Sequence, residues 1–128
     1  MIRSFPEACK KLKLNPAKVL PRINGIPKRH QKAVIAQAKL IIIAEALNDG
    51  WKPNWTNSSE WKYYPWFWMD APGFRFVGSD CTDTVAYTGA GSRLCFKTKE
   101  LSDYAGKKFI TLWRDLMVLP APPKRKKK

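Results

Sequence analysis

The chain of 128 residues contains only one histidine and three cysteines. The cysteines (Cys9, Cys81 and Cys95) are odd in number and lack the paired spacing of zinc ligands. The sequence therefore predicts free, buried thiols in a reducing compartment, not a disulfide scaffold. A single histidine also excludes most histidine-containing zinc sites and most schemes in which an imidazole acts as the base. We expect no metal and no cofactor.

Long apolar runs are also absent. The longest, residues 40–44, has five residues, whereas about twenty are needed to cross a bilayer. The N-terminus lacks an apolar segment followed by a small-residue cleavage site, so we expect no secretory signal. We predict one small domain with no membrane partner.

Acidic residues are scarce. The chain has ten Asp and Glu but 24 Lys and Arg, so its net charge is +14. Residues 1–40 hold ten basic side chains and one acid, and residues 124–128 hold five basic side chains. Residues 41–123 hold nine of each sign. Solubility alone favours interspersed signs, so this segregation indicates a polyanionic partner, either nucleic acid or an acidic protein surface.

Capping signals predict the helices. Ser4, Pro6 and Glu7 form a capping pattern for a short helix over about 5–12, and Asn15-Pro16 predicts one further turn over about 16–20. Residues 21–27 form a connector. A long helix then runs from about Pro27 to residues 48–50, with apolar residues on nearly all sides, which indicates burial on most sides.

Strand and turn signals follow from residue 50 onward. We expect strands over residues 63–69, 74–77, 84–88 and 92–98, and an amphipathic helix from 98 to about 118. Pro65 cannot donate to a sheet ladder, so its strand should lie at an edge or carry a bulge.

The predicted fold class is therefore α+β. A three- or four-stranded antiparallel sheet packs against a long central helix and a C-terminal amphipathic helix, with short N-terminal helices. Residues 1–119 form the domain, with 1–27 as its basic helical N-terminal segment, and 120–128 form a proline-rich linker and basic tail.

Three runs carry a family resemblance: residues 41–53 (IIIAEALNDGWKP), 61–67 (WKYYPWF) and 91–97 (GSRLCFK), followed by Leu101, Tyr104, Ala105, Gly106 and Lys107. They resemble a family of small proteins carried by bacteriophages of Bacteroidetes and by the genomes of their hosts. The resemblance covers about residues 4–118. It implies a phage or prophage setting, in the bacterial host cytoplasm or the virion, and it brings no catalytic residues with it.

The aromatic segment over residues 51–68 has two interpretations. Its rings can stack on unpaired bases beside a basic groove, or they can form the core between sheet and helices. We favour the core for Trp61, Trp66 and Trp68. Trp51 and Trp55, in a loop with Asn and Pro, are the candidates for exposed, stacking rings.

Catalysis is the weakest interpretation. His30 lies within a basic stretch, and Cys81 stands between two carboxylates, Asp80 and Asp83, which disfavour the thiolate needed for attack. A hydrolase of unknown type remains only a third alternative.

The favoured function is non-enzymatic, largely sequence-independent binding of packaged or free nucleic acid through its phosphates. The contributing residues would be Lys10, Lys11, Lys13, Lys18, Lys28, Arg29, Lys32, Lys124, Arg125, Lys126, Lys127 and Lys128. The alternative is a virion structural or protein-interaction module that uses the aromatic face and is compatible with a homo-oligomer. A helix-turn-helix within residues 4–47 is a further, less favoured arrangement.

Overall fold

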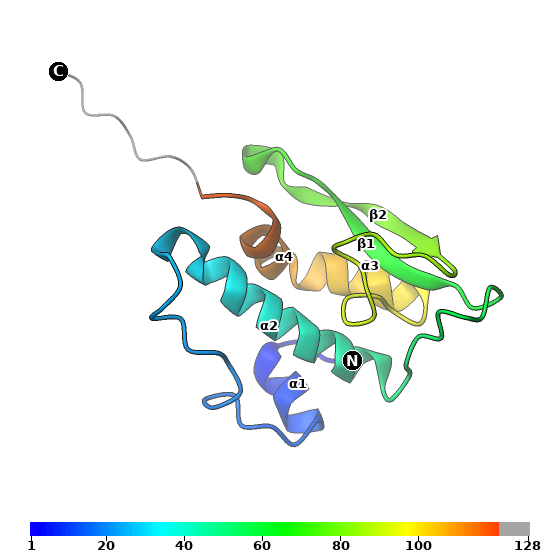
Figure 1. Ribbon diagram of the computed structural model, residues 1–128, viewed down its shortest axis with the longest axis horizontal. Helices are drawn as coiled ribbons and strands as arrows, with labels where there is room; N and C mark the ends of the chain where they lie inside the picture. Colours follow the sequence, from blue (N-terminus) through cyan, green and yellow to red (C-terminus); the bar gives the residue numbers. More distant parts are fainter. Residues whose placement is uncertain (121–128) are drawn as a thin grey trace.

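The computed structural model describes residues 1–120 and shows an α+β fold (Figure 1). In chain order its elements are α1 (Phe5–Lys11), α2 (Lys28–Asn48), β1 (Lys62–Trp68), a 3-10 turn (Ala71–Gly73), β2 (Arg75–Thr82), α3 (Lys99–Lys108) and α4 (Ile110–Met117). The sheet packs on α3, α4 packs on α2, and α1 packs on α2 (Figure 1). No helix in the described chain is long and apolar enough to cross a membrane.

The two N-terminal helices follow their sequence signals. Ser4 caps α1 by accepting the Glu7 amide, and the Glu7 carboxylate accepts the Arg3 amide at 2.8 Å. Asn15 begins the predicted single turn, because its side chain accepts the Ala17 amide at 2.9 Å and its carbonyl accepts the Val19 amide at 3.1 Å. Residues 12–27 contain no further helix, so the helix-turn-helix is wrong. The α2 helix begins directly after Pro27 and ends at Asn48, and its C-cap residue Asp49 has a left-handed φ of 49°.

The sheet has two strands in the described chain, and the prediction of three or four is wrong. Strands β1 and β2 pair antiparallel, with Pro65 opposite Ser79, and the register shifts between Trp66 and Phe67. Trp66 pairs with Gly78 and Phe67 with Phe76, so Val77 is the extra residue of a β-bulge. Val77 belongs to β2, so the strand that contains Pro65 carries no bulge of its own. Its place at the edge of the two-stranded sheet confirms the other part of the expectation.

The predicted strands over 84–88 and 92–98 are replaced by turns and one bridge, Tyr63 to Phe96. Asn48 supplies the reason, because its buried side chain donates to the Cys95 carbonyl at 2.9 Å and accepts the Lys97 amide at 3.0 Å. These are the two main-chain groups on the side of Phe96 that faces away from Tyr63. A helix side chain therefore takes the place of another strand.

The C-terminal helix is also interrupted, at Phe109, where φ is −108° and ψ is 31°. The prediction of one continuous helix is wrong. Beyond the break, the Trp113 indole donates to the Ala105 carbonyl at 3.1 Å, and Phe109 and Trp113 are both buried. The change of direction lets both rings enter the core.

The core contains fewer tryptophans than the sequence predicts. Trp61, Trp66 and Trp68 are 50%, 49% and 54% exposed, so their assignment to the core is wrong. The larger buried groups are Leu40, Ile43, Leu47, Phe74, Phe96, Phe109 and Trp113. Helix α3 covers only one face of the two-stranded sheet, and Trp66 and Trp68 lie on the uncovered face.

Candidate nucleic-acid interface

Seven of the predicted phosphate-binding side chains lie within the described chain, and all seven are exposed. They come from the end of α1, the loop after it, and the first turns of α2: Lys10, Lys11, Lys13, Lys18, Lys28, Arg29 and Lys32. We call this set the basic N-terminal surface. The segment that carries it follows the lower and left border of the molecule (Figure 1). The tail residues Lys124, Arg125, Lys126, Lys127 and Lys128 lie outside the described residues.

Only one of these seven cations forms an ion pair within residues 1–120. Lys11 contacts Asp49 at 3.2 Å and donates to the Ala46 carbonyl at 2.7 Å, so it joins α1 to the end of α2. The other two ion pairs of the described chain involve Lys62 and Lys99. The other six exposed cations form no ion pair within the described chain, whereas Lys11 has a structural role.

The start of α2 increases the positive potential of this surface. Its first turn contains no acid, and its N-cap Pro27 provides no side-chain hydrogen bond. Lys28 and Arg29 instead stand at the positive pole of the helix dipole, which costs a few tenths of a kcal/mol and up to about 1. An anion bound by the open amides of this turn would relieve the repulsion.

Helix α4, the last helix before the described chain ends at Pro120, lies close to the basic N-terminal surface. Leu112 and Asp115 of α4 line a shallow pocket of about 300 Å³ together with Lys32 and Ile35 of α2. Helix α4 therefore contacts the first half of α2, close to the basic N-terminal surface.

Trp51 and Trp55 are not the exposed rings that the sequence predicts. Both are half-buried, and their indole N–H groups donate to Glu60 at 3.3 Å and to Ser92 at 2.7 Å. The Trp55 ring also contacts the Lys62 ammonium, 5.2 Å from the ring centroid. These contacts stabilise the loop, and stacking on bases by these two rings stays a prediction without structural support.

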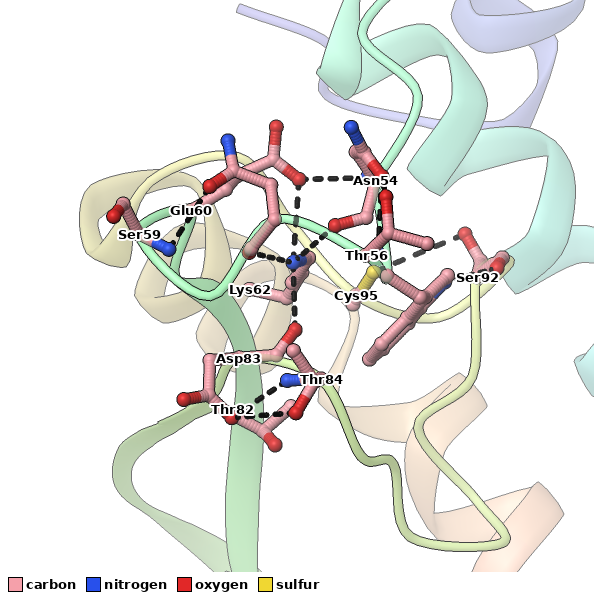
Figure 2. Close-up of polar contacts among 12 residues, drawn as sticks. Asn54, Thr56, Ser59, Glu60, Lys62, Thr82, Asp83, Thr84, Ser92 and Cys95 are labelled. Atoms are coloured by element: carbon pink, nitrogen blue, oxygen red, sulfur yellow. Dashed lines mark hydrogen bonds and ion pairs between the residues drawn. The ribbon is translucent and has the colours of Figure 1, made fainter.

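Lys62 is the residue that sequence reasoning missed. Its side chain is fully buried, and its ammonium donates to the carbonyls of Asn54, Asn57 and Asp83 at 2.6, 3.2 and 2.6 Å (Figure 2). Glu60 adds a carboxylate oxygen at 3.4 Å. Hydrogen bonding from the Asn54 amide, with those from Lys62 and Trp51, holds the Glu60 pKa below its ordinary value against the opposing effect of burial. Every proton of the ammonium has a partner, so the cluster closes the loop rather than presenting a reactive amine.

The two buried thiols, Cys9 and Cys95, are not activated as nucleophiles. Burial raises the pKa of Cys95 to about 11 and also raises that of Cys9, which disfavours the thiolate in both. Within residues 1–120, no three His, Cys, Asp or Glu side chains come together as a metal-ligand set.

No family model, no curated protein and no solved structure matches the chain.

Proposed function

We propose that this protein binds nucleic acid mainly through its phosphates, with little sequence preference, in a phage-related setting. The observation that supports this most strongly is the basic N-terminal surface, where six exposed cations have no ion pair in the described chain. Flexible ammonium groups act as point charges for phosphates rather than as rigid readers of base edges. The tail would add five further charges.

The proposal predicts a strong dependence of affinity on salt. If six to eight phosphates of a duplex are neutralised, log K against log salt has a slope of about −5 to −7. Fluorescence anisotropy of random-sequence DNA at several salt concentrations measures this slope. Salt-independent or absent binding would reject the proposal.

A triple substitution tests the location of the site. Lys28→Gln, Arg29→Gln and Lys32→Gln together should reduce the magnitude of the slope by about 2 to 3, because each lost phosphate contact contributes about 0.9. The matched control removes three exposed lysines elsewhere: Lys52, Lys97 and Lys108. The control should change the slope by less than about 1. Equal losses in both proteins would mean that only total charge matters.

Removal of residues 120–128 tests the tail. Binding should weaken and lose part of its salt slope, because five basic side chains are removed. The melting temperature should stay near that of the full chain, which circular dichroism measures. An unchanged slope would remove the tail from the interface.

The second candidate is a virion structural or protein-interaction module, and the exposed rings favour it. Trp61, Trp66 and Trp68 are each about half exposed. Val77, the β2 residue between the pairing partners of Trp66 and Phe67, is 55% exposed. Exposed apolar patches mark interaction sites on soluble proteins. A homo-oligomer that loses stability when Trp66 and Trp68 are replaced by serine, measured by sedimentation, would support this alternative.

A further inference from the structure

A groove of about 670 Å³ runs along the edge of β1 that does not face β2. Four consecutive residues of the strand line it, from Tyr64 to Phe67. Because alternate side chains of a strand point to opposite faces, contact with all four places the groove along the strand edge. Its other walls come from α2, α4 and the loop 87–94. The volume lies within the range of established binding pockets.

The edge of β1 presents unpaired main-chain groups to this groove. Tyr63 exchanges both of its main-chain hydrogen bonds with Phe96, at 3.0 and 2.7 Å, on the side away from β2. By the alternation of a strand, Pro65 and Phe67 direct their main-chain groups to the same side. In the described chain these groups have no main-chain partner outside the sheet, because turns at Tyr87–Ala90 and Gly91–Leu94 bend the neighbouring segment away. The Pro65 carbonyl and the Phe67 amide and carbonyl are therefore available.

The side chains around this edge are mostly apolar, and the uncharged polar ones are Gln37, Thr88 and Ser92. Arg93 is the only charged residue among those that line the groove, and it is exposed and makes no ion pair within residues 1–120. The buried Trp113 and the half-buried Leu116 form apolar walls. A ligand that fits this surface has an apolar row and one negative charge.

We propose that the groove binds an extended segment of a partner protein, which adds a strand to β1. The segment continues the pairing that Phe96 begins, and its main chain bonds to Pro65 and Phe67. Every second side chain is apolar and enters the groove, and one acidic side chain pairs with Arg93. This mode obtains affinity from main-chain hydrogen bonds and specificity from alternate side-chain positions.

The test is selection of displayed random peptides on four immobilised full-length proteins. The natural chain should enrich peptides that alternate apolar residues and carry Asp or Glu. Gly89→Trp should abolish enrichment, because Gly89 lines the groove and an added side chain there meets no atom within 4 Å. Gly25→Trp is the matched control, since Gly25 is equally open and lies outside the lining. Arg93→Glu should reverse the charge preference from acidic to basic peptides.

Hydrogen exchange gives a direct readout of strand addition. The Phe67 amide should exchange at least about tenfold more slowly when an enriched peptide is bound. Enrichment that Gly89→Trp leaves intact, peptides with helical spacing, or an unprotected Phe67 amide would each overturn the proposal. So would binding of dodecanoate in the groove without any enriched peptide, which would assign it to small apolar anions.

Discussion

Replacement of Lys62 by methionine should destabilise the fold by about 3 kcal/mol. The buried ammonium donates to the carbonyls of Asn54, Asn57 and Asp83, and the first and last of these bonds are 2.6 Å long. Methionine has a similar length but donates nothing, so these carbonyls and the Glu60 carboxylate lose their shared partner. Denaturant unfolding of the two proteins measures the difference.

The matched control for this change is Lys97→Met, because the Lys97 side chain is exposed. It should alter the free energy of unfolding by less than about 0.5 kcal/mol. If Lys62→Met were as small in its effect, the cluster in Figure 2 would not hold the loops at residues 54–57 and 83 together.

Replacement of Gly106 by alanine should destabilise the fold by about 1 to 3 kcal/mol, although alanine is the better helix former by about 1. A Cβ on Gly106 would lie 2.5 Å from a ring carbon of Phe76 and 2.9 Å from Pro65 Cβ. The close approach of α3 to the sheet therefore requires the absence of a side chain here. Thermal or denaturant unfolding shows directly whether the free energy of unfolding falls or rises.

Two comparison proteins sharpen this prediction. Gly25→Ala should leave stability within about 0.5 kcal/mol, because an added Cβ there meets nothing within 4 Å. Phe76→Leu combined with Gly106→Ala should cost less than the sum of the single changes, since the smaller side chain gives room to the methyl group. A Gly106→Ala protein more stable than the natural chain would show that α3 shifts without strain.

Much of the helical structure could be predicted because its signals are local. Ser4 and Glu7 act within one turn, and Pro27 and Gly50 mark the two limits of α2 by their own backbone preferences. Pro65 similarly indicated an edge strand, since a missing amide has the same consequence in any sheet.

The number of strands and the residues of the core could not be predicted from local signals. The Asn48 side chain occupies main-chain groups near Phe96 that alternation alone assigns to another strand. The covering of one sheet face by α3 decides that Phe67 and Phe76 point inward and that Trp66 and Trp68 stay exposed. Composition carries no information about which sheet face a helix covers.

The features of the candidate site also fall into two groups, those that the sequence determined and those that only the tertiary structure decided. The sequence by itself determined the segregation of charge, the caps, the turns and the edge character of β1, because each depends on residues a few positions apart. Only the tertiary structure decided that Lys11 is paired while six neighbouring cations are not, that Lys62 is buried among carbonyls, and that a groove lies along β1. Those features require contacts between residues 8 to 50 or more positions apart, and such contacts form only when the helices and the sheet pack together.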